Sequence, residues 1–479
     1  VQTQVVNALR ILHKPDWTRR GMWNKRYFEA ARPKVPAILS ELLSHQNFAD
    51  MYLAQDPRFK FDVCRAYYKG ILKFLSYENG LPFVVQPLPV DHFGMKLEGN
   101  ALKLSWAPVN DPLEQTAVPT SYRVYKRVED GGFDEGFVVK EPNVILTDLK
   151  PGTIYSFKVA ALNDGGESFP SEILACALPV NNTKPVLVVN GFDRICAPDA
   201  FDNGKEAGFR MSEDEGVAWH ENMTYIGEQY DFDRQSQWLD DDASGFGSSF
   251  ADQETRIVPG NSFDYPYVHG KSIRNNGFGF ISTSDECFEK GDYPASSFSL
   301  FDLIFGEEKT TKRFIGIPGK DFTIFTTAMR EAISKIAERE GTKIFVSGAY
   351  LGSDLGLCGD TLARKFASDV LHYKHRTAHG SKSGLIYTVN SLKKSLSEQY
   401  HYVNNWNPSI YKVEAPDAIE PAGKNASVLF RFFGDNKSAG VWYKDKYQAI
   451  TLTVPLETIT TDSERDAIMK QLLQQLEVK

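Results

Sequence analysis

A carboxylate follows a short apolar run near the start of the chain. Val35–Leu39 has the composition of a short buried strand, and Glu41 stands just beyond its end. A carboxylate at the mouth of a strand can accept and return a proton, as a general base and acid does in hydrolysis. A solvated carboxylate at a strand end is the alternative interpretation. The position of Glu41 therefore raises the question of what its carboxylate could act on.

A second stretch has the shape of a nucleophile turn. An apolar strand runs into the sequence Gly348-Ala349-Tyr350-Leu351-Gly352, and a helix is expected to follow. The turn places Tyr350 where a nucleophile would stand. A phenol with a pKa of roughly 10 is a poor nucleophile at neutral pH. The turn therefore predicts the architecture of a catalytic site without its chemistry.

Aromatic side chains collect in a long polar insertion, residues 203–278. Flat aromatic faces with planar polar groups at their rim are typical of sites that stack on sugar rings. The candidate substrate-binding residues are Trp219, His220, Trp238 and Tyr265. Ordinary packing of the insertion against a sheet explains the same composition equally well. The candidate ligand is peptidoglycan or another polysaccharide.

The chain of 479 residues is long enough for about three domains of ordinary size. Its composition, 42% hydrophobic and 24% charged, is that of a globular protein. The net charge of −8 and the absence of a Lys/Arg block make nucleic acid and anionic membranes poor partners. No apolar run approaches the roughly 20 residues that span a bilayer. The five cysteines lack the spacing of zinc ligands, so no metal-binding residue is assigned.

Three segments follow one another along the chain. In residues 1–84, a helix over Val1–Leu12, the short strand and a helix over Asp62–Leu75 make one and a half βα units. Residues 85–180 contain short alternating strands separated by turn residues, the pattern of a β-sandwich. Residues 183–479 alternate strands with helices, which predicts a parallel sheet covered on both faces. The predicted fold class is multidomain: a partial α/β unit, a β-sandwich and an α/β parallel-sheet domain.

The middle segment resembles a fibronectin type III domain. Trp106 stands where that family has its core indole, and Tyr155, six residues after Leu149, stands in the tyrosine-corner position. Sandwiches of this kind are usually spacers or adhesion modules, so the resemblance specifies a fold rather than a function. A spacer is the expected role.

Residues 19–75 resemble the C-terminal part of the catalytic domain of zinc-dependent N-acetylmuramoyl-L-alanine amidases. The matching positions are the Arg20-Gly21 turn, Pro36, Ala37, Leu39 and Glu41 in the strand, Ser44, Asn47 and Asp50 in the loop, and Ala66, Gly70 and Ile71 in the last helix. By this resemblance, Glu41 transfers protons beside a zinc-bound water while the amide between lactyl group and L-alanine is cleaved. The zinc ligands of the family precede this part. We therefore expect zinc in the parent enzyme and none bound to this chain.

The last segment resembles the class I glutamine amidotransferase fold, with its flavodoxin-like layers. That family has a Cys in a G-x-C-x-G turn and a His-Pro-Glu at the end of a later strand. Tyr350 stands in place of the Cys, and Pro455-Leu456-Glu457 stands in place of His-Pro-Glu. Because nucleophile and base are both missing, this resemblance implies a non-catalytic relative.

The order of the three segments resembles multidomain cell-envelope proteins of Bacteroidetes type, some of which carry the name xanthan lyase. No constellation of residues supports polysaccharide β-elimination. The leading hypothesis is a portion of a peptidoglycan-cleaving amidase, inactive alone, whose later domains position the enzyme on its substrate. An N-terminal amidase half would then be its partner. The alternative is a non-enzymatic glycan-binding or scaffold protein. Either would be periplasmic, outer-membrane-associated or secreted.

Overall fold

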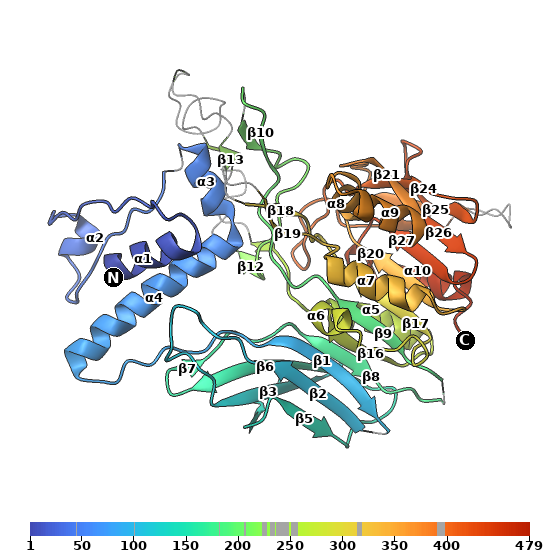
Figure 1. Cartoon of the computed structure of the whole chain (residues 1–479), viewed down its shortest axis with the longest axis horizontal. Coiled ribbons are helices and arrows are strands. Elements are labelled where there is room, and N and C mark those ends of the chain that lie inside the picture. Colours follow the sequence, from blue (N-terminus) through green and yellow to red (C-terminus); the bar gives the residue numbers. More distant parts are fainter. Residues whose placement is uncertain are drawn as a thin grey trace.

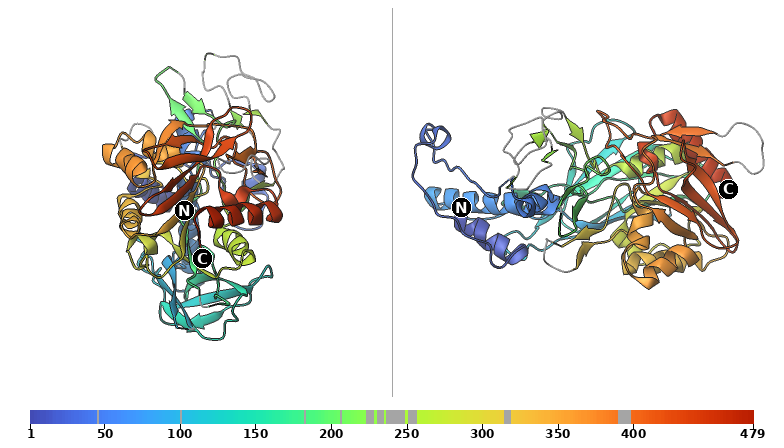
Figure 2. Two further views of the ribbon diagram at one scale, coloured as in Figure 1. Left: turned by 90° about the vertical axis from the view of Figure 1, so that its right-hand side faces the viewer. Right: turned by 90° about the horizontal axis from the view of Figure 1, so that it is seen from above.

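The computed structural model shows three parts in chain order: N-terminal helices, a β-sandwich and an α/β domain (Figure 1). It describes residues 1–479 except 45, 100, 182, 206, 223–227, 230–234, 236–248, 251–256, 314–318 and 390–397. The sandwich lies between the other two parts in sequence, and all three meet in space (Figure 2). Within the described residues, no helix has the length and apolar character needed to cross a membrane.

The N-terminal part is helical. Its elements are α1 (Gln2–Leu12), α2 (Phe28–Ala31), α3 (Phe48–Gln55) and α4 (Pro57–Asn79). The helices predicted at both ends of this segment are thereby confirmed as α1 and α4. They pack closely, because Ala66 is fully buried and a Cβ added to Gly70 would lie 3.0 Å from the Cα of Val1. A small separate apolar core holds this unit together.

The strand predicted at Val35–Leu39 is wrong. These residues form exposed coil between α2 and α3, with the apolar side chains of Val35, Ile38 and Leu39 turned to solvent. A parallel strand needs a neighbouring strand to pair its N–H and C=O groups. Among the described residues, the first strand of the chain begins only at Asp91. The segment read as a partial α/β unit is therefore helical in this chain.

Two sheets form the sandwich. One contains β1 (Asp91–Glu98), β2 (Ala101–Ala107) and β5 (Asn143–Leu146); the other contains β4 (Phe137–Val139), β3 (Ser121–Val128), β6 (Ile154–Asn163) and β8 (Leu174–Ala177), with β7 (Gly166–Glu167) beside β6. Trp106 is buried between them, and its ring lies 5.4 Å from that of Tyr122. The hydroxyl of Tyr155 accepts a hydrogen bond of 3.1 Å from the backbone N–H of Lys150. The predicted core indole and tyrosine corner are confirmed.

The third part contains a mixed sheet. Five parallel strands lie in the order β16 (Phe280–Ser284), β9 (Val186–Asn190), β17 (Leu300–Ile304), β20 (Lys343–Ser347) and β27 (Gln448–Leu452). Antiparallel strands β26 (Ser438–Lys444), β25 (Ala426–Phe432), β22 (Leu385–Thr388) and β23 (Gln399–His401) continue it. The predicted parallel strands are thus present, but the antiparallel strands make the sheet mixed rather than parallel. Such apolar strands form because both faces are covered by helices.

Helices pack on both faces of this sheet (Figure 2). One face carries α5 (Tyr265–Asn275) and α10 (Asp462–Gln475); the other carries α6 (Asp285–Glu289), α7 (Thr327–Ala337) and α9 (Thr361–Asp369). Shorter elements are α8 (Leu351–Gly356), η1 (Leu456–Thr458), β10 (Ala200–Asp202), β11 (Ala207–Phe209), β12 (Glu221–Asn222), β13 (Glu228–Gln229), β14 (Ser249–Phe250), β15 (Val258–Pro259), β18 (Thr311–Lys312), β19 (Lys320–Phe322), β21 (Tyr373–Thr377) and β24 (Ala418–Pro421). The predicted insertion occupies the connection between β9 and β16.

The sandwich and the α/β domain are joined through a common core. Strand β16 pairs with β9 and also contacts β8 and β1 of the sandwich. The buried hydroxyl of Ser282 accepts from the N–H of Ala175 and donates to its carbonyl, both at 2.8 Å. Arg127 of the sandwich donates to both carboxylate oxygens of Asp264, at 2.6 and 2.7 Å. The sandwich therefore shares buried surface with the next domain, and its expected role as a spacer stays a prediction.

Candidate functional site

The carboxyl end of strand β9 is the topological switch point of the sheet. From β9 the chain goes to β16 on one side and then crosses to β17 on the other. The loops that follow these three strands separate at this point, which is where open α/β sheets hold their ligands. The side chains that these loops place at this point are therefore candidates for a functional site.

The loop after β9 is held in a fixed course. Asn190 ends the strand, and a Cβ at Gly191 would lie 2.7 Å from the ring of Phe305, so only glycine fits here. The side-chain amide of the buried Asn261 donates to the carbonyls of Phe192 and Arg194, both at 3.0 Å. Asp193 projects from between these two anchored residues.

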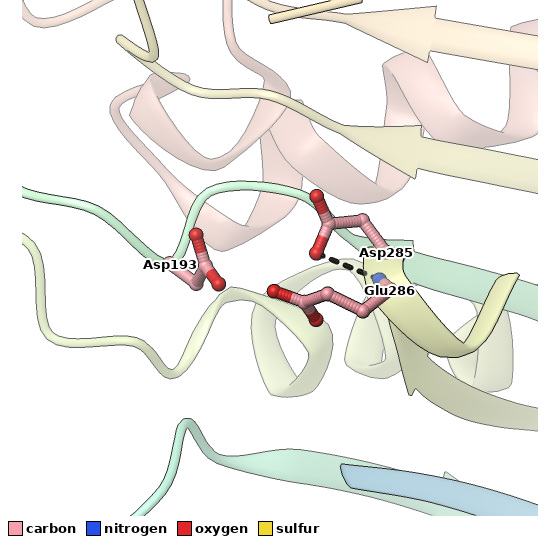
Figure 3. Close-up of side chains that lie close together, drawn as sticks. All are labelled: Asp193, Asp285 and Glu286. Atoms are coloured by element: carbon pink, nitrogen blue, oxygen red, sulfur yellow. Dashed lines mark hydrogen bonds between the residues drawn. The ribbon is translucent and has the colours of Figure 1, made fainter. Parts of the chain in front are cut away.

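Three carboxylates meet at this edge of the sheet. Asp193 comes from the loop after β9, and Asp285 and Glu286 begin α6 directly after β16 (Figure 3). One oxygen from each of the three lies within 4.8 Å of the others. Glu172 of the sandwich joins them, because it accepts a hydrogen bond of 2.7 Å from the amide of Asn190. We call Glu172, Asp193, Asp285 and Glu286 the junction carboxylates.

Three of the junction carboxylates, Glu172, Asp193 and Asp285, have raised pKa values. Burial, and then the charge of Glu286, raise the pKa of Asp193 to about 7. Burial and neighbouring carboxylates also raise the pKa values of Asp285 and Glu172 well above the ordinary range. The Nε of Arg194, 3.8 Å from Asp193, opposes this effect. The side chain of Asp193 is 21% exposed, so its carboxylate remains partly accessible to solvent.

A second charged group lies fully buried behind the sheet edge. In α5, the Nδ1 of His269 lies 2.9 Å from Asp302 and its Nε2 lies 3.2 Å from Glu457. Tyr411 donates to the other oxygen of Glu457 at 2.8 Å. Burial alone lowers the pKa of His269, but the two carboxylates outweigh it and raise the pKa to about 9. His269 is therefore a protonated, structural ion partner without access to solvent.

Tyr350 occupies the predicted turn. It follows β20 and precedes α8, so the strand–turn–helix arrangement is confirmed. Its hydroxyl donates to Glu307 at 3.2 Å, and burial raises the pKa of Tyr350 far above its usual value. A buried phenol that is committed to a carboxylate has no means of acting as a nucleophile.

The structure brings two of the predicted aromatic residues together. The ring of Trp219 lies 4.8 Å from that of Phe169 of the sandwich, edge to face, and 5.6 Å from that of His220. Tyr265 is only 2% exposed and stacks on Phe192, so its ring belongs to the core. Trp238 lies outside the described residues. The predicted sugar-binding set is thus divided between a surface pair and a core residue.

Glu41 lies in exposed coil rather than at a strand end. Its side chain is 62% exposed and accepts a hydrogen bond of 2.9 Å from Arg20. The predicted loop residues serve a helix, because Asn47 caps α3 and Asp50 accepts from the N–H of Ser44 at 2.9 Å. Across the described ranges, no group of three ligand-type side chains includes Glu41. These residues by themselves therefore do not fit a zinc site.

The junction carboxylates were not predicted as site residues from the sequence. Asp193 comes three residues after the apolar run of β9, and Asp285 and Glu286 directly follow that of β16. An acidic residue just past the end of one predicted strand was the available signal, whereas no strand was predicted before Asp285 and Glu286. The contribution of Glu172 required knowledge of how the sandwich docks.

Comparison with known proteins identifies the middle part. The family model of the fibronectin type III domain matches residues 89–177. A mouse protein, fibronectin type-III domain-containing protein 3A, is 29% identical over 105 residues, which are 20% of this chain and 8% of that protein. This chain thus matches a small part of that relative.

Solved structures match over the same part of the chain. The twitchin kinase region from C. elegans shares 24% identity, with 21% of this chain and 18% of that chain covered, at a TM-score of 0.19. A human fourth fibronectin type III domain shares 23% identity over 20% of this chain and 82% of that chain, at a TM-score of 0.18. Residues 89–177 are therefore a fibronectin type III domain, here built onto a mixed sheet with parallel strands and helices.

Proposed function

We propose that this chain is a glycan-binding part of a cell-envelope protein, with its ligand held where the sandwich meets the α/β domain. The observation that carries the proposal is the aromatic group of Phe169, Trp219, His220 and Phe263. Phe169 belongs to the fibronectin type III domain and is 47% exposed, whereas the other three belong to the insertion. Two domains thus contribute rings to one group, in which Phe169 and His220 are exposed while Trp219 and Phe263 are half-buried.

The surroundings of this aromatic group suit a sugar. Sugar rings stack on aromatic faces, while their hydroxyl groups donate to carboxylates and amides at the rim. Glu172 follows Phe169 by three residues in the sequence. The backbone of Trp219 forms an isolated β-bridge with that of Asn261, and the side chain of Asn261 anchors the loop that carries Asp193. Phe61 of α4 lies 6.5 Å from Phe169, so the N-terminal helices border the same surface.

Retention on insoluble glycans tests this proposal. The full chain is incubated with peptidoglycan and with neutral polysaccharides, and the bound fraction is measured. We expect retention on peptidoglycan, weakened about tenfold in Phe169→Ala, as removal of one stacking contact predicts. Trp219→Ala should weaken binding similarly. Full retention of both variants, or no retention of the wild type on any glycan, would overturn the proposal.

Trp406→Ala is the matched control. Trp406 is an exposed indole of the same domain, and it does not belong to the aromatic group around Phe169 and Trp219. Its removal should leave retention unchanged. The full chain is required, because the sandwich and the α/β domain share one core and the isolated last segment would expose it.

A second candidate function is a portion of an N-acetylmuramoyl-L-alanine amidase, in which Glu41 transfers protons during cleavage of a peptidoglycan amide. The contact between Arg20 of the Arg-Gly turn and Glu41 favours it, because two separate parts of the resemblance meet at 2.9 Å. The close packing of Ala66 and Gly70 against α1 also agrees with the family's helix pattern. The zinc ligands would have to come from residues other than Glu41 and the matching positions around it.

Activity of the complete protein tests the amidase proposal. Glu41→Gln should lower peptidoglycan amide hydrolysis by at least about 100-fold, which is the typical contribution of a general base. Glu29→Gln, an exposed glutamate of α2, is the control and should keep full activity. Wild-type hydrolysis in Glu41→Gln would remove Glu41 from the mechanism, while glycan retention stays an independent measurement.

A further inference from the structure

We propose that Asp193, Asp285 and Glu286 bind a hard divalent cation, calcium or magnesium, at the carboxyl end of β9. Their oxygens converge from two loops that the sheet topology brings together (Figure 3). The proposal goes beyond glycan binding, because it concerns the carboxylates and not the aromatic group. It is also tested with the cation alone.

The charge balance of this site calls for a cation. Three carboxylates share a space of a few ångströms, and the charges of Glu286 and Asp193 also act on Glu172 of the sandwich. Arg194 lies 3.8 Å from Asp193, but its guanidinium also stacks on Phe322, with 3.8 Å to the ring centre. Carboxylates crowded in this way either take up protons or share a metal ion.

Two buried polar side chains beside the cluster have unused acceptors. Glu308 is 1% exposed; one of its oxygens accepts from the N–H of Arg194 at 2.9 Å, while Oε2 has no hydrogen-bond partner in the described part of the chain. Glu308 thus contacts the backbone of the residue next to Asp193, and burial, followed by the charge of Asp193, raises its pKa well above the ordinary range. The unpartnered Oε2 is an independent sign of a missing positive partner.

Asn190 provides the second unused acceptor. Its side chain is fully buried, and its nitrogen donates to Glu172, so the amide group reaches the cluster. Its Oδ1 has no partner among the residues that the structure describes. Amide and carboxylate oxygens are the ligands that complete calcium and magnesium shells in proteins. A bound cation would satisfy acceptors that are otherwise costly to bury.

The donor set decides the class of metal. Each side chain of the site offers oxygen, whereas zinc, copper and nickel sites draw on His nitrogen or Cys sulfur. Cys287 lies next to Glu286 in sequence, but its thiol donates to the carbonyl of His92 at 3.1 Å. Calcium and magnesium prefer oxygen ligands and accept water in the remaining positions. Through Glu172, the ion would also link the fibronectin type III domain to the sheet.

Calorimetric titration of the full chain tests the proposal. Chelator-treated protein is titrated with calcium chloride and, separately, with magnesium chloride. We expect one site per chain with a Kd of roughly 10⁻⁶ to 10⁻³ M for at least one ion. The same ion should raise Tm by roughly 2–4 °C at saturation. The two titrations show which ion the site prefers.

Isosteric variants locate the ion. Asp193→Asn combined with Glu286→Gln keeps the side-chain shapes and should weaken binding at least tenfold. Asp285→Asn alone is a second variant in case the pair disturbs folding. Asp164→Asn removes one exposed charge from a turn of the sandwich and should bind like the wild type. No heat and no Tm shift up to about 10 mM of either ion, or unchanged binding in the folded variants, would overturn the proposal.

Discussion

Two charged groups at the same sheet are built in opposite ways. His269 lies between Asp302 and Glu457, and Tyr411 donates to the remaining oxygen of Glu457. The junction carboxylates, in contrast, gather charges of one sign, while unpartnered acceptors occur in both groups, at Oδ1 of Asp302 and at Oε2 of Glu308. The first group is sealed from solvent, whereas Asp193 in the second remains partly exposed.

The difference separates structural from functional charge. In the first group a buried imidazolium offsets part of the charge of two carboxylates, whereas the second group has three carboxylates and one flanking guanidinium. A partly open cluster of carboxylates gains from any positive ion or donor that reaches it. The cluster also lies at the switch point of the sheet, where open α/β sheets bind their ligands. The contribution of both groups to the free energy of unfolding can therefore be measured with variants.

The largest expected effect comes from breaking the His269 group. His269→Ala leaves two buried carboxylates without their cation and should lower the free energy of unfolding by about 3–5 kcal/mol. Urea unfolding followed by tryptophan fluorescence measures it. His401→Ala is the control, because His401 pairs with Glu464 at the surface and should cost at most about 1 kcal/mol. Equal losses in both variants would remove the contrast between buried and exposed pairs.

The protonation of His269 should also make the free energy of unfolding depend on pH. Its pKa is raised in the folded state to about 9, above the roughly 6.5 of an unfolded histidine. Its contribution is therefore complete below about pH 6.5 and is lost as the pH rises through about 9, by up to roughly 3 kcal/mol. The measurement is the difference in unfolding free energy between wild type and His269→Ala from pH 6 to 10. A difference that stays constant over this range would mean that His269 is neutral when buried.

The junction carboxylates should respond in the other direction. Asp193→Asn removes one of several like charges and should raise the free energy of unfolding by about 1–2 kcal/mol at pH 8 in chelator. Chemical unfolding with and without saturating calcium is the measurement. In Asp164→Asn the change should stay within about 0.5 kcal/mol. A destabilised Asp193→Asn in chelator would show that the charge of Asp193 is already compensated.

The smallest effect is expected at Glu41. Because its ion pair with Arg20 is exposed, Glu41→Gln should change the free energy of unfolding by less than about 1 kcal/mol. Thermal unfolding of the full chain is a sufficient measurement. A larger loss would mean that Glu41 is engaged by contacts beyond this ion pair.

Part of the site was predictable from sequence and part was not. The strands before Asp193 and before Tyr350 were predictable, because uninterrupted apolar runs that end at glycine turns are typical of buried parallel strands. The half-buried position of Trp219 against Phe169 and the core position of Tyr265 were not, since both lie in the same aromatic insertion. Burial of an aromatic ring depends on what packs against it, and here that is another domain.

The sequence by itself determined the fibronectin type III domain and the class of the sheet beside it. Trp106 and Tyr155 occupy positions that only one sandwich pattern explains, and local strand signals suffice for the rest. Only the tertiary structure decided that Val35–Leu39 remains coil, since a strand exists through its neighbours. It likewise decided that Glu172 and Asp193, from different domains, share one charged site, because contacts distant in sequence leave no local pattern.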